Sequence, residues 1–223
     1  TTDTLDMSGP ESIKDPCIIA VVQRRSRYSM QSEQVLDLFR DLGALLEGHF
    51  ELSSGLHSSG YLQCALVLQH PAHAETLGSA LADQAQHLAP TVVLAPALGG
   101  VVIGQEVARG LGVRGIFAER KEDQLMLRRG FTLDCTDRVL IVEDVVTTGK
   151  STRETIAVAR ESGASVVGAT TVVDRSGSRD LFDVPFYSLA AVSWPAYAPE
   201  SCPLCFAGVR AVKPGSRPPK PVE

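Results

Sequence analysis

Two adjacent carboxylates followed by a turn of small hydroxyl residues form the part of this chain best suited to chemistry. The apolar run 139–142 ends in Glu143 and Asp144, and a helix is expected to begin near Lys150. The residues around that helix start are small and able to hydrogen-bond: Thr147, Thr148, Gly149, Ser151 and Thr152. Free N–H groups at a helix start suit a phosphate monoester. The carboxylates would repel phosphate, so we assign them to sugar hydroxyls or to a divalent metal held between carboxylate and phosphate.

A nucleoside-triphosphate P-loop is excluded for the same segment. Gly149, Lys150 and Ser151 match the end of that motif, but its first glycine must lie five positions before Gly149. Asp144 occupies that position. The backbone therefore lacks the glycine with which a P-loop wraps its phosphates.

The elements that position this turn are predicted from the hydrophobic pattern. Short apolar runs suit central parallel strands that are covered on both faces. The four runs of this kind are 91–95, 139–142, 165–173 and 185–192. Helical stretches lie between them, which indicates an α/β fold with a doubly wound parallel sheet. Ligands bind at the carboxyl ends of such strands, where Glu143 and Asp144 stand.

Helical spacing is clearest in four stretches. Apolar residues from Val35 to Leu46 predict an amphipathic helix with Ser32 as N-cap and Gly48 as its stop. A turn at 53–60 is expected before a strand at 61–66, and Pro71 opens the second helix. The other two helices contain Ile103, Val107 and Leu111, and residues 151–161 with Gly163 just beyond.

Composition describes a folded, water-soluble chain. It has 223 residues, 44% of them hydrophobic and 21% charged, and a formal net charge of −5. The acidic balance does not favour nucleic-acid binding, and no apolar run is long enough to cross a bilayer. Five cysteines, an odd number, do not indicate a disulfide scaffold. We expect a cytoplasmic protein with no membrane and no nucleic-acid partner.

The chain divides into three parts by pattern. Residues 1–29 lack steady periodicity and are expected to be a disordered extension, residues 30–212 the domain that carries the chemistry, and residues 213–223 a tail. Met30 directly precedes the first helix, so it is a candidate for the natural start. An intact mass beginning at Met30 would support that expectation, and one beginning near Thr1 would refute it.

The strand, acidic pair and Thr/Gly/Ser turn together resemble the phosphoribosyl-pyrophosphate motif of type I phosphoribosyltransferases. The resemblance implies that Glu143 and Asp144 hold the ribose hydroxyls and that 147–151 cradles the 5-phosphate. It also implies the type I phosphoribosyltransferase fold, with a small hood built from the N-terminal and C-terminal parts. The phosphoribosyl-pyrophosphate-binding residues it implies are Glu143, Asp144, Val145, Val146, Thr147, Thr148, Gly149, Lys150, Ser151, Arg120, Lys121, Gly99 and Gly100.

Three flanking segments resemble the orotate phosphoribosyltransferase family in particular. Phe50–Leu62 is similar to its N-terminal signature, Ala95–Gly100 to its pyrophosphate loop, and Arg175 to the arginine that meets the orotate carboxylate. An arginine fork pairs a carboxylate bidentately, which fits that role. The resemblance covers residues 32–217. The orotate-binding residues it implies are Thr147, Arg175, Tyr61 and Leu62.

The chain departs from that family at several positions. Ser53 and Gly99 stand where many members have lysine, and Gln124 and Met126 stand where the mobile catalytic loop has Lys and His. The loop 119–130 keeps Arg120 and Lys121 and adds Arg128 and Arg129. We hypothesise that the two added arginines neutralise pyrophosphate in place of the missing Lys and His. The alternative is that this segment is a solvated basic hairpin without a role in catalysis. Arginine is a poor general acid, so the departure affects proton delivery.

The resemblance implies a reaction and its participants. Orotate and phosphoribosyl pyrophosphate would give orotidine 5-phosphate and pyrophosphate, a step of pyrimidine and UMP biosynthesis. Catalytic roles fall to Asp144, Lys121 and Arg120. The cofactor would be Mg²⁺ carried by the substrate, with Asp144 the one candidate ligand from the protein. A homodimer is implied, with the catalytic loop acting across the interface.

Other functions remain open from the sequence. The same fold serves purine and xanthine phosphoribosyltransferases, and regulators that sense phosphoribosyl pyrophosphate without chemistry. The basic run 24–27 is the one feature that favours such a regulator, because regulators of this kind often carry a nucleic-acid-binding surface. Cys202 and Cys205 could serve redox or zinc chemistry, but a single Cys-x-x-Cys without a second pair favours a structural role. His70 and His73 lack acidic or cysteine neighbours in sequence and are not expected to bind metal.

Overall fold

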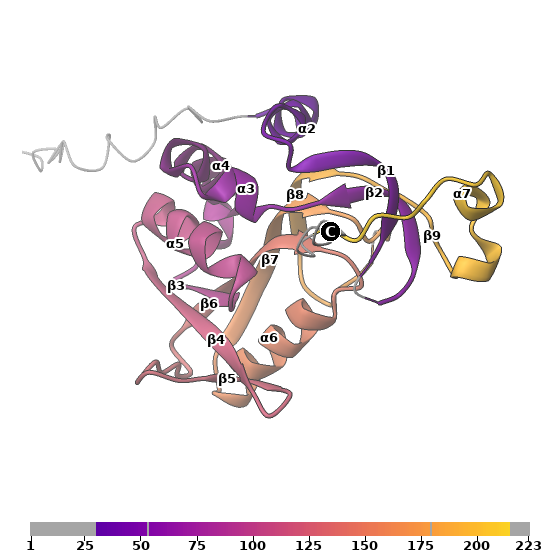
Figure 1. The fold of residues 1–223 in the computed structure, drawn as a ribbon. Helices are drawn as coiled ribbons and strands as arrows, with labels where there is room; N and C mark the ends of the chain where they lie inside the picture. The colour runs from indigo at the N-terminus through magenta and orange to yellow at the C-terminus, as the bar shows by residue number, and fades with distance from the viewer. Residues whose placement is uncertain (1–29, 53, 179, 215–223) are drawn as a thin grey trace, which may run out of the picture.

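A six-stranded sheet forms the centre of the molecule in the computed structural model, which describes residues 30–52, 54–178 and 180–214 (Figure 1). The strand order is β5-β4-β3-β6-β7-β8, with every neighbouring pair parallel except β4 and β5. The strands are β3 (Val92–Pro96), β4 (Arg114–Lys121), β5 (Gln124–Leu127), β6 (Arg138–Val146), β7 (Ser165–Asp174) and β8 (Phe186–Ala191). The predicted doubly wound sheet is confirmed.

Helices cover both faces of this sheet. Contacts place α2, α4 and α5 on one face and α6 on the other, an arrangement visible in Figure 1. The main helices are α2 (Ser32–Asp41), α4 (Pro71–Ala85), α5 (Gly99–Leu111) and α6 (Lys150–Glu161). Short elements α3 (Ala65–Leu68) and η1 (Gln86–Leu88) flank α4. No helix in the described ranges is both long and apolar enough to cross a membrane.

A second, three-stranded sheet forms the predicted hood from both ends of the chain. Its order is β1-β2-β9, all antiparallel. The elements of the hood are β1 (Leu45–Glu51), β2 (His57–Leu62), β9 (Ala196–Tyr197), η2 (Pro199–Ser201) and α7 (Pro203–Phe206). Figure 1 shows β9 and α7 beside the β1–β2 pair. The N-terminal and C-terminal parts of the described chain therefore meet in one small layer.

Three boundaries differ from the sequence prediction. The first helix ends at Asp41, because Gly43 takes a φ of 64° and the chain then enters β1. Leu45 and Leu46 thus belong to a strand. The strand expected at 61–66 is instead β2 at His57–Leu62, which begins within the expected turn at 53–60, and α3 begins at Ala65. The loop expected at 119–130 instead contains the end of β4 and all of β5.

The expected ends of the domain are only partly visible. Residues 1–29 lie outside the described residues, as do 215–223, so the proposed extension and most of the tail are not described. Lys213, placed in the tail by sequence, forms an ion pair of 2.6 Å with Glu51 of β1. Val212 also bridges Phe50. The chain is therefore held against the hood at least as far as Lys213.

Candidate active site

The two carboxylates at the end of β6 point to opposite faces of the sheet. Glu143 is buried, and its Oε1 accepts a hydrogen bond of 2.8 Å from the Thr152 hydroxyl on α6. Asp144 faces the other side, where a β-carbon placed on Gly99 would lie 2.7 Å from its Oδ1. This divergence follows from the alternation of side chains along a strand. The acidic pair can therefore contact two different parts of one ligand.

Burial perturbs both carboxyl groups. Desolvation raises the pKa of Glu143 to about 7, and the nearby Asp144 charge adds to the effect while hydrogen bonds from Thr152 and Ser151 oppose it. Burial also raises the pKa of Asp144 above its ordinary value. Carboxylates that water solvates poorly gain most from a hydroxyl donor or a cation. Perturbation of this kind is typical of functional sites.

A cavity of about 640 Å³ opens beside Glu143, between the end of β6 and the start of α6. Gly149 precedes α6 with a φ of 72°, a conformation that favours glycine. The free N–H groups of the first helical turn face this region, together with the positive end of the helix dipole. The residues that line the cavity are Arg120, Asp123, Glu143, Val145, Val146, Thr147, Thr148, Gly149, Lys150, Ser151 and Thr152.

The turn after β3 approaches the same strand end. Gly99 and Gly100 are the first residues of α5, and a β-carbon on Gly100 would lie 3.0 Å from the Val142 carbonyl oxygen. Gly99 packs as closely against Asp144, so a lysine at this position, as the family resemblance implies, would displace that carboxylate. The two glycines thus place backbone, rather than a cation, against the acidic strand end. This is the switch point between β3 and β6, where open α/β sheets bind ligands.

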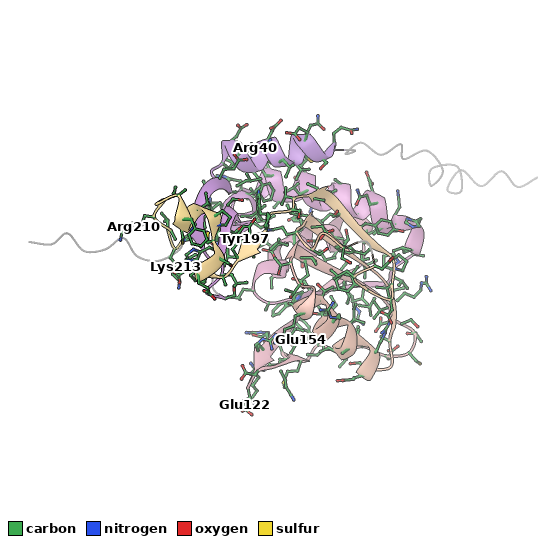
Figure 2. The ribbon with its side chains drawn as sticks, turned by 90° about the vertical axis from the view of Figure 1, so that its right-hand side faces the viewer. Arg40, Glu122, Glu154, Tyr197, Arg210 and Lys213 are labelled. Carbon is green, nitrogen blue, oxygen red and sulfur yellow. The ribbon has the colours of Figure 1, made fainter. Side chains whose placement is uncertain are left out.

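Arg120 reaches the cavity from the β4–β5 hairpin. It forms an ion pair with Glu154 of α6 and also donates to the Asp123 carbonyl oxygen. Lys121 is exposed at the end of β4. Figure 2 shows Glu122 at the far end of this hairpin and Glu154 on the adjacent helix. Of the two cations predicted here, Arg120 lines the cavity and Lys121 does not.

The other two arginines of the expected loop are placed differently. Arg129 makes two hydrogen bonds of 2.8 Å to Glu119, and its guanidinium lies 5.8 Å from the centre of the Phe117 ring. Arg128 follows the end of β5, away from the hairpin turn. Neither lines the cavity. This arrangement does not support their predicted role as substitutes for the missing Lys and His.

Arg175, just after β7, stacks on Trp194. Its guanidinium lies 4.8 Å from the centre of the indole, and its Nε is buried without a hydrogen-bond partner among the described residues. Burial lowers the pKa of Arg175, and the Cys64 thiol lies near both this guanidinium and the Asp144 carboxylate. An unsatisfied buried donor is costly, so an acceptor beside the Arg175 Nε would be favourable.

The hood approaches Arg175 through Trp194. A β-carbon on Gly60 of β2 would lie 2.2 Å from the Trp194 ring, so the missing side chain makes room for the indole. Tyr61 is half-buried against Phe50, with 5.8 Å between the ring centres. Leu62 points the other way, into the hydrophobic core. Sequence reasoning gave no role to Trp194 or Glu154, because neither lies within a motif.

The matching family model describes a phosphoribosyl transferase domain and covers residues 66–197. An orotate phosphoribosyltransferase of Carboxydothermus hydrogenoformans is 52% identical over 182 residues, which are 81% of this chain and 95% of that protein. Its counterpart from Heliobacterium modesticaldum is 49% identical over 193 residues, covering 84% of this chain and all of that protein.

Solved structures agree with these relatives. The orotate phosphoribosyltransferase of Aeropyrum pernix superposes with a TM-score of 0.61 at 27% identity, over 71% of this chain and 93% of that one. That of Mycobacterium tuberculosis in complex with 5-phospho-α-D-ribosyl 1-diphosphate gives a TM-score of 0.58 at 23% identity, over 71% and 94% of the two chains, and shows the common fold. By its motifs, its fold and these relatives, the chain belongs to the orotate phosphoribosyltransferase family.

Proposed function

We propose that this protein transfers the phosphoribosyl group of 5-phosphoribosyl 1-pyrophosphate to orotate, forming orotidine 5-phosphate and pyrophosphate in pyrimidine biosynthesis. The observation that carries the proposal is the cavity between the acidic end of β6 and the start of α6. It brings the Glu143 carboxylate against a helix start suited to an anion, with Asp144 on the opposite face of the same strand, in a chain 52% identical to a named orotate phosphoribosyltransferase.

The 5-phosphate would bind at the turn 147–151. Backbone N–H groups of this turn and of the first turn of α6 can donate to phosphate oxygens, and Gly149 lets the backbone approach closely. The side chains of Thr147 and Thr148 are exposed and able to add hydroxyl donors. Lys150 adds a positive charge at the same edge of the cavity.

The ribose hydroxyls would bind at the acidic pair. Each hydroxyl can donate to a carboxylate oxygen, and donors of this kind relieve the cost of burying Glu143 and Asp144. Thr152 fixes the orientation of Glu143 before the ligand arrives. The sugar is thus positioned by groups that need little rearrangement, which lowers the entropic part of the barrier.

The pyrophosphate would leave between the 99–100 turn and the hairpin end. Gly99 and Gly100 bring backbone N–H groups near Asp144, and Arg120 supplies charge from the side of the cavity. The Asp144 carboxylate is an oxygen ligand of the type that Mg²⁺ takes together with substrate phosphates. When bound, Mg²⁺ would neutralise charge on the departing pyrophosphate. Breaking the C1–O bond leaves positive charge on the ribose ring, as in glycoside chemistry.

Orotate would lie toward the hood. The Arg175 fork can pair its carboxylate, with Trp194 holding the guanidinium plane. The Tyr61 ring, half-buried in β2, and Thr147, at the cavity, would flank the base. Leu62 contributes to this region only through the core beneath β2. We further propose that the enzyme works in the cytoplasm as a homodimer, in which Arg120 lines its own chain's cavity and the exposed Lys121 at the hairpin end reaches the partner's site.

A substrate panel tests the function. Purified protein, Mg²⁺ and phosphoribosyl pyrophosphate are incubated separately with orotate, uracil, adenine, hypoxanthine or xanthine, and consumption of base and release of pyrophosphate are followed. We expect turnover with orotate alone. Turnover of a purine would replace the proposal with a purine-type transferase. Binding of phosphoribosyl pyrophosphate without turnover of any base would identify a sensor.

A further inference from the structure

Four potential metal ligands from distant parts of the chain meet in the hood. They are His49 of β1, His57 of β2, Cys202 between η2 and α7, and Cys205 of α7. Their ligand atoms all lie within 4.8 Å of one another. His49, His57 and Cys202 are buried, with 3%, 9% and 1% of their surfaces exposed. None of the four lines the cavity beside Glu143, so this cluster is separate from the candidate active site.

The distances within the cluster are close to those around a tetrahedral ion. Zn–S bonds of about 2.3 Å and Zn–N bonds of about 2.0 Å place neighbouring ligand atoms about 3.3 to 3.8 Å apart. The His49 Nε2 atom lies 3.4 Å from Cys202 Sγ and 3.8 Å from Cys205 Sγ. The His57 Nδ1 atom lies 3.2 Å from Cys205 Sγ and 2.9 Å from His49 Nε2. A small outward movement of the two imidazoles would accommodate an ion.

A hydrogen bond to the other ring nitrogen of His49 also supports a metal site. Its Nδ1 lies 2.7 Å from the Val209 carbonyl oxygen. A carbonyl oxygen only accepts, so Nδ1 is the donor to Val209 and Nε2 is the ring nitrogen that faces the cluster. Metal-binding histidines are commonly oriented in this way, by donating their other N–H to a carbonyl or carboxylate.

We propose that His49, His57, Cys202 and Cys205 hold one Zn²⁺ ion in a closed, structural site. Two thiolates and two imidazoles form a ligand set that zinc prefers, and four protein ligands leave no open position for chemistry. The site lies outside everything that the transferase reaction uses. It requires no oxidant or reductant, only loss of the two thiol protons when the metal binds.

The ion would stabilise elements that are too short to be stable alone. β9 has two residues, η2 three and α7 four, and segments this short do not hold together by their own hydrogen bonds. Two residue pairs link β2 to β9, and the Val212 and Lys213 contacts tie the chain end to β1. Figure 2 shows Tyr197, Arg210 and Lys213 on this C-terminal segment. A metal ion would fasten the whole segment to the β1–β2 pair.

The test begins with metal content. Full-length protein without an affinity tag is purified, and bound zinc is measured by mass spectrometry. We expect about one zinc per chain in the wild type. The Cys202→Ser/Cys205→Ser double variant and His57→Asn should lose most of it. Cys135→Ser and His87→Asn, which change an exposed cysteine and an exposed histidine, should keep it.

Measurements on the wild type keep the test independent of whether the variants fold. Cobalt should replace zinc and give the ligand-field and thiolate charge-transfer bands of a tetrahedral site. A strong chelator should lower the melting temperature, and added zinc should restore it. A zinc-free protein that binds neither metal would overturn the proposal, as would full zinc retention in the double variant. A disulfide between Cys202 and Cys205 would also overturn the proposal. It would show as an intact mass two hydrogens below that of the reduced chain, with both cysteines resistant to alkylation.

Discussion

The Arg120 guanidinium is ion-paired with the Glu154 carboxylate, which joins the β4–β5 hairpin to α6 beside the cavity. The pair holds a cation near the place proposed for pyrophosphate while no phosphate is bound. Both side chains are partly exposed, and exposed pairs of this kind contribute about 1 kcal/mol or less to stability. A phosphate oxygen can therefore displace Glu154 at little cost.

Replacing Arg120 should affect catalysis rather than folding. We expect Arg120→Ala to lower kcat/KM for phosphoribosyl pyrophosphate about 10- to 100-fold, because a charge-assisted contact to the leaving group is lost. Thermal unfolding should change little. Arg129→Ala is the matched comparison from the same hairpin, since Arg129 is held by Glu119. A larger loss in Arg129→Ala than in Arg120→Ala would show that the hairpin rearranges to use the other arginine.

Asp144 provides a sharper test of the sugar site. Asp144→Asn keeps the shape of the side chain but removes the charge that faces the 99–100 turn, so turnover should fall about 100-fold or more. Stability should hold, because burial already disfavours the charged form of Asp144. Steady-state kinetics and thermal melts measure the two effects. Asp183→Asn, at an exposed carboxylate paired with Arg160, serves as control. Wild-type turnover in Asp144→Asn would refute the role.

The raised pKa of Glu143 predicts how stability depends on pH. Its ordinary pKa is 4.5 and its pKa in the folded protein is about 7, so the folded state holds the proton more tightly. The stability from this group is complete below pH 4.5 and is lost as the pH rises through 7, by at most about 3 kcal/mol. Glu143→Gln should lack this decline and should unfold at a higher denaturant concentration than the wild type above pH 7.

Ligand binding should shift the same titration. Ribose hydroxyls that donate to Glu143 favour its ionised form, so binding near pH 7 should release protons. Calorimetry in buffers of different ionisation enthalpy measures that release. Glu143→Gln should abolish it, whereas Glu161→Gln, at the exposed end of α6, should not. Equal proton release in the wild type and in Glu143→Gln would place the ribose elsewhere.

Arg175 should determine affinity for the base. Arg175→Gln removes the charged fork and should raise the KM for orotate about 10- to 100-fold, with a much smaller change in the KM for phosphoribosyl pyrophosphate. Arg160→Gln, on the outer part of α6, provides the control. The two KM values are measured from initial rates, with one substrate varied and the other held fixed in turn. Equal changes in both constants would indicate a general disturbance around Trp194 rather than recognition of the orotate carboxylate.

Much of the central sheet could be predicted because its strands are apolar on both faces. β3, β6, β7 and β8 each overlap a predicted run. β4 was missed, since Arg114–Lys121 mixes charged and apolar residues, as suits a strand whose ends are exposed. The helix predicted to reach Leu46 was too long, because Leu42, Leu45 and Leu46 continue the helical spacing past a turn at Gly43.

The candidate site also has a part that could be predicted from the sequence and a part that could not. The residues of the β6–α6 turn are contiguous in sequence, so their meeting at the cavity could be predicted from a single segment. Contacts between distant segments could not. Nothing in the spacing shows that Glu154 pairs with Arg120, or that Trp194 supports Arg175. The Cys202–Cys205 pair seemed to lack partners because 153 residues separate Cys202 from His49. Only the fold brings them together.

The most direct test of the account is a crystal structure with Mg²⁺ and phosphoribosyl pyrophosphate bound. We expect the 5-phosphate against the backbone N–H groups of 147–151, the ribose hydroxyls on Glu143 and Asp144, and the pyrophosphate between Gly99 and Arg120. A ligand bound away from the β6–α6 turn, with Glu143 still bonded only to Thr152, would contradict the account.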